Sequence, residues 1–304
     1  MKHLFTFLLM LLTGLGMIAQ PPAVGTQTLE GLQHPESALA EGGFIYVSNV
    51  GNELKPEAKD NDGYISKYTR TGQLVEQRFI RNLNAPKGMV IVKSILYIAD
   101  VDKIVAYSLL SKRAMTPISF EGLTTFLNDI TVKDDTSLLV SATDAGKVYK
   151  VNLVTQKISE YAKGVIIQGI NGLDYDAKSK VLYVSSMGVN GVPNGEIGKI
   201  IFNKVYRYER IGSDNGMFDG IKLFNDDLYY TDWRSMEKGG VLKKFSLISK
   251  QSTTILEGEV SEKGGLEKKK LEPLMGCADF CIDAKTKIMY IPLMLIGKVI
   301  SHQL

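Results

Sequence analysis

Side chains that could hold a metal recur at one position of a repeated pattern. Each copy has a polar residue, a small residue and a short apolar-alternating run, then a polar turn and a β-branched run. The residues at the first position are Glu36, Lys87, Asn128, Asn171, Asp219 and Ala278. Four of them carry hard oxygen donors with a summed charge of −2, which suits Ca²⁺ and also Mg²⁺ or Mn²⁺. A metal-free channel whose polar residues hold ordered water fits the same spacing.

Each copy reads as two strands joined by a hairpin. Residues 170–175 (INGLDY) and 181–185 (VLYVS), with a polar turn between them, are a clear example. First positions follow one another at intervals of 51, 41, 43, 48 and 59 residues. Such a period is typical of a four-stranded propeller blade. A third strand that opens with glycine is expected at residues 63–68, 146–151, 240–245 and 297–301, and a fourth at 156–161 and 251–256.

The last copy has no sequence left for a fourth strand, but the start of the chain can supply one. Residues 25–31 (GTQTLEG) resemble residues 251–258 (QSTTILEG), an expected fourth strand. An N-terminal strand in the last blade closes the ring and removes its exposed edges. The sequence therefore predicts an all-β, six-bladed propeller over residues 20–304, with blades opening near 36, 87, 128, 171, 219 and 278.

Residues 1–19 are expected to be a signal peptide. Lys2 and His3 precede an apolar run of about 15 residues, shorter than the roughly 20 needed to span a bilayer, and 19–22 (AQPP) follow. We expect export to a periplasm or the medium, with no membrane span after cleavage. An uncleaved anchor is the alternative.

The composition and the missing motifs argue against several other classes of protein. The net charge of +3 is interspersed, so no basic stripe predicts nucleic-acid binding. Cys277 and Cys281 fall on one expected inner strand, about 13 Å apart, too far for a disulfide, and are expected to be buried free thiols. No G-x-S-x-G, H-E-x-x-H or phosphate-binding glycine loop occurs.

Blade geometry places the six first positions at one mouth of the central channel, because every first strand starts there. Loops between second and third strands surround the same mouth, and the long ones are residues 50–62, 187–196 and 233–239. Trp233 and Arg234 lie in the last of these and could stack on or clamp a substrate. Ordinary packing of a loop-end aromatic is the alternative for Trp233.

The order Glu36, Asn128, Asn171, Asp219 resembles the metal-site pattern of the SMP-30/gluconolactonase/LRE-like family, and more distantly that of diisopropyl-fluorophosphatase and paraoxonase propellers. The resemblance lies in the segments 126–129 (FLND), 170–173 (INGL) and 218–221 (FDGI).

This resemblance implies a divalent cation, usually Ca²⁺ or Zn²⁺, held by Glu36, Asn171 and Asp219, with Asn128 ligating it or contacting substrate. It also implies hydrolysis of an ester-like ring, most often a sugar lactone. By the same resemblance, Asp219 is the expected base.

Some positions depart from the family pattern. Phe126 stands where sugar-lactone members tend to carry arginine. We expect Phe126 to line the substrate site, and its presence indicates a substrate other than a sugar lactone. Lys87 stands where paraoxonases place histidine. It could bind an anionic group or act as a base if its pKa is depressed, or be a solvated channel lysine that balances Glu36 and Asp219.

Two hypotheses follow. The first is an exported, metal-dependent lactonase or esterase acting on a small molecule. The second is a non-catalytic propeller, similar to NHL-repeat modules, that binds a glycan, peptide or protein on its loop-rich face. Asp129 and Asp279, each one residue after a first position, are expected to point into the blade or to cap a turn rather than to meet the metal.

Overall fold

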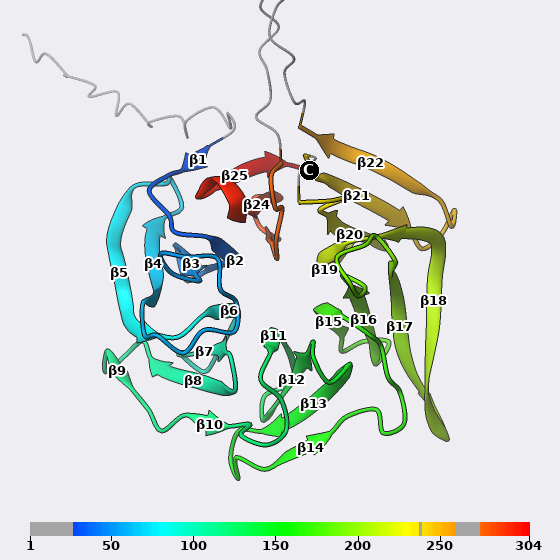
Figure 1. Cartoon of the computed structure of the whole chain (residues 1–304), viewed down its shortest axis with the longest axis horizontal. Coiled ribbons are helices and arrows are strands. Elements are labelled where there is room, and N and C mark those ends of the chain that lie inside the picture. Colours follow the sequence, from blue (N-terminus) through cyan, green and yellow to red (C-terminus); the bar gives the residue numbers. More distant parts are fainter. Residues whose placement is uncertain (1–26, 237–238, 259–273) are drawn as a thin grey trace, which may run out of the picture.

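The computed structural model describes residues 27–236, 239–258 and 274–304. These residues form six antiparallel sheets of four or five strands arranged around one axis (Figure 1). The first strand of each blade lies nearest the centre and the last lies at the periphery (Figure 1). The predicted six-bladed propeller is confirmed.

The blades follow the chain in order. Blade 1 contains β2 (Pro35–Glu41), β3 (Phe44–Asn49), β4 (Gly63–Thr69) and β5 (Leu74–Leu83). Blade 2 contains β6 (Pro86–Val92), β7 (Ile95–Asp100), β8 (Lys103–Ser108), β9 (Arg113–Ala114) and β10 (Ile118–Ser119). Blade 3 contains β11 (Leu127–Asp134), β12 (Ser137–Ala142), β13 (Lys147–Asn152) and β14 (Ile158–Glu160).

The second half repeats this plan. Blade 4 contains β15 (Ile170–Asp176), β16 (Val181–Ser186), β17 (Gly195–Asn203) and β18 (Val205–Gly216). Blade 5 contains β19 (Phe218–Phe224), β20 (Asp227–Asp232), β21 (Val241–Ser246) and β22 (Ser252–Glu257). Blade 6 contains β23 (Cys281–Asp283), β24 (Ile288–Leu293), the 3-10 helix η1 (Met294–Ile296) and β25 (Lys298–Gln303), with β1 (Thr28–Leu29) as its outer strand.

An N-terminal strand completes the last blade, as predicted. β1 pairs antiparallel with β25, with Thr28 opposite Ile300 and Leu29 opposite Val299. The sheet order β1-β25-β24-β23 therefore joins the two ends of the described chain. The expected signal peptide at residues 1–19 lies outside the described residues. Within the described ranges, no helix is long and apolar enough to cross a bilayer.

Apolar packing fills the space between neighbouring blades. The second strands are buried on both faces, which explains their continuous apolar sequences. In β3, Ile45 and Val47 pack toward blade 6, whereas Tyr46 packs toward Ile98 of blade 2. The six hydrophobic clusters are these six interfaces, so apolar packing joins each blade to the next.

The last inner strand departs from the prediction. β23 begins at Cys281 and not at Ala278, because the preceding residues make only isolated bridges, Ser37 with Asp279 and Cys277 with Leu293. Cys277 and Cys281 are both buried and free, as predicted.

Candidate metal centre at the channel mouth

An irregular register at the start of the first strands fixes how the mouth residues are presented. Such shifts occur between Pro35 and Ser37, Pro86 and Met89, Leu127 and Ile130, Ile170 and Leu173, and Phe218 and Ile221. Each interval contains one of the predicted site residues. A β-bulge of this kind re-aims a side chain and is often found beside functional sites.

Hydroxyl groups on the second strands hold these bulges. Ser141 Oγ accepts a hydrogen bond from the Asp129 N–H at 2.9 Å and donates one to the Asn171 carbonyl of the next blade at 2.6 Å. Ser185 in the same way accepts from Gly172 and donates to the Asp219 carbonyl. Each hydroxyl therefore ties two neighbouring blades at the mouth.

Two further hydroxyls follow this pattern in part. Ser48 accepts from the Ser37 N–H at 2.9 Å, and Thr231 accepts from the Gly220 N–H at 2.9 Å and donates to the Ala278 carbonyl at 3.1 Å. Sequence reasoning missed this role, although a Ser or Thr recurs at the same position of four copies.

Glu36, Asn128, Asn171 and Asp219, which we call the oxygen quartet, are almost completely buried, with exposed fractions between 2 % and 4 %. One side-chain oxygen of each lacks a hydrogen-bond partner among the described residues: Glu36 Oε2, Asn128 Oδ1, Asn171 Oδ1 and Asp219 Oδ1. Buried polar atoms in native proteins are nearly always paired, so four unpaired oxygens in one repeat position demand an explanation.

The two carboxylates are electrostatically coupled. Burial raises the pKa of Glu36 well above its ordinary value, Asp219 raises it further and Lys87 opposes the rise. Burial likewise raises the pKa of Asp219, with Asp279 adding to the effect and the indole N–H of Trp233 opposing it. Without a nearby cation, the protein stabilises the protonated forms of both groups.

The quartet fits a divalent cation. It offers only hard oxygen atoms, from two carboxylates and two amides, which is the donor set of Ca²⁺ more than of Zn²⁺. No group of three or more His, Cys, Asp and Glu side chains suited to a metal occurs in the described parts of the chain. A cation here would therefore depend on both asparagines as well as on both acids.

Lys87 is buried at the same mouth, with an exposed fraction of 1 %. Its Nζ donates to the carbonyl oxygens of Pro56 at 2.6 Å and Ala85 at 2.9 Å, and lies 4.9 Å from the centre of the Phe126 ring. Burial lowers the pKa of Lys87 to about 8, against the attraction of Glu36. Lys87 is thus not the solvated lysine that the sequence allowed, and Phe126 packs against its ammonium.

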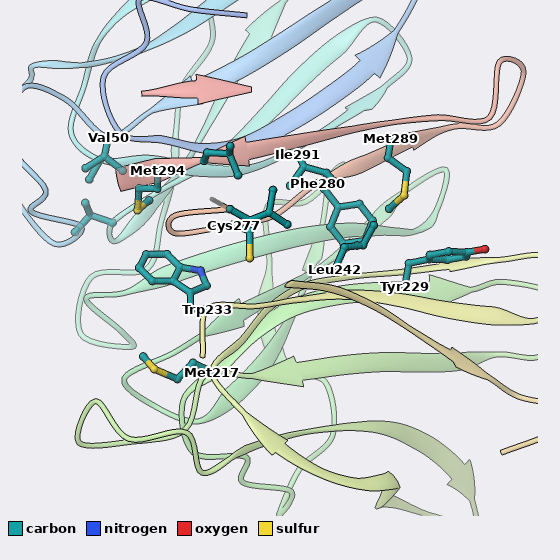
Figure 2. Packing of buried hydrophobic residues seen from close by; sticks show 14 residues of the cluster. Val50, Met217, Tyr229, Trp233, Leu242, Cys277, Phe280, Met289, Ile291 and Met294 are labelled. Atoms are coloured by element: carbon teal, nitrogen blue, oxygen red, sulfur yellow. The ribbon is translucent and has the colours of Figure 1, made fainter. Parts of the chain in front are cut away.

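Trp233 and Arg234 have different surroundings. The Trp233 indole is buried among Met217, Cys277 and Met294, which Figure 2 shows gathered around it. Arg234 is half-buried, and its guanidinium pairs with Glu257 at 2.6 Å. Trp233 therefore belongs to the surroundings of Asp219, whereas Arg234 is held by the outer strand β22.

A second charged layer, which the sequence did not predict as a unit, lies next to the quartet in the channel. We call Asp129, Lys222 and Asp279 the lower tier. Lys222 Nζ lies 3.2 Å from Asp129 Oδ2 and 2.9 Å from Asp279 Oδ1. The two acids therefore link different blades through the Lys222 ammonium. Nothing in the repeated pattern marks Lys222, which lies on β19 three residues after Asp219, because the other copies carry no lysine at this position.

A cavity of about 300 Å³ opens beyond the lower tier, lined by residues further along the first strands, such as Met89, Ile130, Leu173 and Phe224. Lys222 and Asp279 also line this cavity. Since the strands start at the quartet, the cavity lies toward the other end of the channel.

Comparisons with known proteins identify the fold. No family model and no curated protein matches the sequence. Among solved structures, a protein provisionally named a gluconolactonase is similar, with 14 % identity, a TM-score of 0.64 and coverage of 92 % of both chains. A catalytically inactive virginiamycin B lyase from Staphylococcus aureus, with quinupristin, has 12 % identity, a TM-score of 0.57 and coverage of 92 % of this chain and 99 % of that one.

A third similar structure is the extracellular domain of a provisionally assigned one-component system from B. thetaiotaomicron. It has 11 % identity, a TM-score of 0.58 and coverage of 90 % of this chain, which spans only 39 % of that one. At these identities the likeness shows that the chain shares its propeller fold with enzymes and with a sensor domain, and no more.

Proposed function

We propose that the chain is an exported, metal-dependent hydrolase that opens a lactone or ester at the channel mouth. The observation that carries the proposal is the oxygen quartet, in which four buried side chains each keep one oxygen unpaired. The resemblance of Glu36, Asn128, Asn171 and Asp219 to the SMP-30/gluconolactonase pattern supports the same conclusion.

The quartet would hold the cation, with Ca²⁺ the best match to its donors and Zn²⁺, Mg²⁺ or Mn²⁺ as alternatives. When bound, the cation would polarise the substrate carbonyl and stabilise the negative charge that develops on its oxygen. Asp219 would take a proton from the attacking water as the new C–O bond forms. It would return that proton to the leaving alkoxide when the ring or ester C–O bond breaks.

Other mouth residues have supporting roles in this proposal. The Trp233 indole N–H opposes the rise in the pKa of Asp219 and would in this way favour the carboxylate form. Lys87 holds residue 56 of the long blade 1 loop and, with its lowered pKa, could serve as a base or bind an anionic substrate group. Asn128, Phe126 and Trp233 would contact the substrate, and Arg234 would do so only if its pair with Glu257 opens.

Calorimetric titration of chelator-treated protein with Ca²⁺ tests the site, with Glu36→Gln as the comparison variant. Stoichiometric binding by the wild type, lost in Glu36→Gln, would establish the quartet and justify a screen of lactones and esters. If neither Ca²⁺, Zn²⁺ nor Mn²⁺ binds, the hydrolase proposal fails, and a propeller that binds a glycan, peptide or protein is the remaining interpretation.

A further inference from the structure

The ammonium group of Lys222 lies inside a cage of oxygen atoms. Its Nζ is 3.2 Å from Asp129 Oδ2, 2.9 Å from Asp279 Oδ1 and 3.4 Å from the Leu173 carbonyl oxygen. Blades 3, 4 and 6 supply these oxygens, and blade 5 supplies the lysine. Carboxylates and backbone carbonyls are also typical Ca²⁺ ligands, and waters would complete the roughly six to eight oxygens that the ion takes.

The chain fixes the Asp129 side of this cage without the lysine. Asp129 Oδ1 accepts a hydrogen bond from the Ile130 N–H at 2.7 Å, and Asp129 Oδ2 accepts one from the Leu173 N–H at 2.7 Å. These bonds come from the backbone of blades 3 and 4. The carboxylate therefore has a reason to stay in place if the ammonium is removed.

The Asp279 side is fixed in the same manner. Asp279 Oδ2 accepts from Ser37 Oγ at 2.7 Å, and the Asp279 N–H donates to the Glu36 carbonyl at 3.0 Å. Oδ1 is left facing the lysine. Because both acids are buried, the loss of the ammonium would leave two uncompensated carboxylates in fixed positions, which is strongly unfavourable unless another cation replaces it.

We propose that Lys222 occupies a second cation position of the channel, as the chain's own substitute for a divalent ion. Removal of its charge would turn Asp129, Asp279 and the Leu173 carbonyl into a Ca²⁺ site. The path for the ion exists: 20 % of the Lys222 side chain remains exposed, and it lines the 300 Å³ cavity at the far end of the channel. An ion could thus enter without passing the oxygen quartet.

The number of Ca²⁺ ions bound per chain tests this proposal. Chelator-treated full-length protein is titrated calorimetrically as wild type, Lys222→Met and Lys244→Met. Lys244 is a matched control because it pairs with Asp227 at 3.1 Å on the neighbouring strands β20 and β21 of the same blade. We expect Lys222→Met to bind one more Ca²⁺ than the wild type and Lys244→Met to bind the same number. An unchanged number in Lys222→Met overturns the proposal.

A second variant separates the new site from non-specific binding. In the double variant Lys222→Met/Asp279→Asn, one carboxylate of the cage is gone, so the additional Ca²⁺ should be lost. If the double variant keeps it, the ion binds elsewhere and the proposal is wrong.

Melting temperatures test the proposal even if Lys222→Met folds poorly without metal. Ca²⁺ should raise the melting temperature of Lys222→Met by more than that of the wild type, because the ion binds only the folded cage. A Lys222→Met protein that stays unfolded in millimolar Ca²⁺ also overturns the proposal. The result is independent of the proposed hydrolase, since it depends on the difference between the two proteins and not on how many ions the wild type binds.

Discussion

The two charged layers of the channel differ in how their charges are paired. Asn128 of the quartet and Asp129 of the lower tier are consecutive residues with similar burial, yet Asn128 Oδ1 has no partner in the described structure and Asp129 accepts three hydrogen bonds. The fold can therefore satisfy buried oxygens at this depth. The quartet oxygens are nevertheless left without partners. This difference indicates that they are arranged for a ligand that the chain itself does not supply.

The two channel lysines show the same difference. Lys222 contacts carboxylates directly, whereas Lys87 donates to the carbonyls of Pro56 and Ala85 and only acts on Glu36 through space. In the lower tier the positive charge pairs directly with the two acids. At the mouth it stabilises a loop and leaves the acid oxygens free.

The largest expected effect comes from removing quartet ligands. Asn171→Ala and Asp219→Ala should each lower metal-dependent hydrolysis by about 100-fold or more, because ligands and preorganised charges in such sites contribute several kcal/mol. The propeller should stay folded, which circular dichroism can verify. Asp144→Ala is the control: Asp144 lies in a loop of the same face, where it accepts from the Ala145 N–H of its own turn and from the Thr125 N–H just before β11. Full activity in both variants would show that the oxygen quartet is not the active site.

The next effect concerns stability in the lower tier. Asp279→Ala should lower the free energy of unfolding by about 3 kcal/mol, because it takes one partner from the buried Lys222 ammonium and one acceptor from Ser37. Asp227→Ala breaks the partly exposed pair with Lys244 and should cost less, about 1 kcal/mol. Urea unfolding measures both. Equal costs would mean that the lower tier is no more structural than a surface ion pair.

Glu36→Gln should act in the opposite direction when no metal is present. It removes one of two coupled buried acids, so in chelator at pH 7 the variant should be more stable than the wild type by about 1 to 3 kcal/mol. In excess Ca²⁺ the order should reverse, since only the wild type gains from binding. A variant less stable than the wild type under both conditions would show that Glu36 is a structural residue.

The same acids give the sign of the pH dependence. In the unfolded chain the pKa values of these acids lie at about 4. Burial raises the pKa values of Glu36 and Asp219 above this in the folded chain. Burial also raises the pKa of Asp129, to about 7. The folded state then binds more protons, so the metal-free protein should lose stability as the pH rises from about 4.5 to 7.5. Melting curves in chelator across this range measure the slope. Glu36→Gln should flatten it, and a slope of the opposite sign would contradict these raised pKa values.

The sequence predicted much of this arrangement because the repeat carries it. The period and the closing strand are properties of local pattern, and the six-bladed fold that they predict is confirmed, although the last inner strand begins at Cys281 and not at Ala278. The lower tier could not be predicted, because Lys222 meets Asp129 and Asp279 only when three distant blades converge on one axis. Blade 2 also has an outer strand in two pieces, β9 and β10, which no strong alternation marks in the sequence.

The smallest expected effect tests how the mouth is held. Ser141→Ala removes the hydroxyl that joins the Asp129 N–H to the Asn171 carbonyl, and the loss of such bonds costs about 1 kcal/mol each. Blade 2 carries Ala99 at the corresponding position, so the fold tolerates the absence of a hydroxyl there. We therefore expect a modest fall in melting temperature but a clear loss of Ca²⁺ affinity, because Asn171 would lose its fixed carbonyl. If stability and affinity fell together in proportion, the hydroxyl would support the fold in general and not the site in particular.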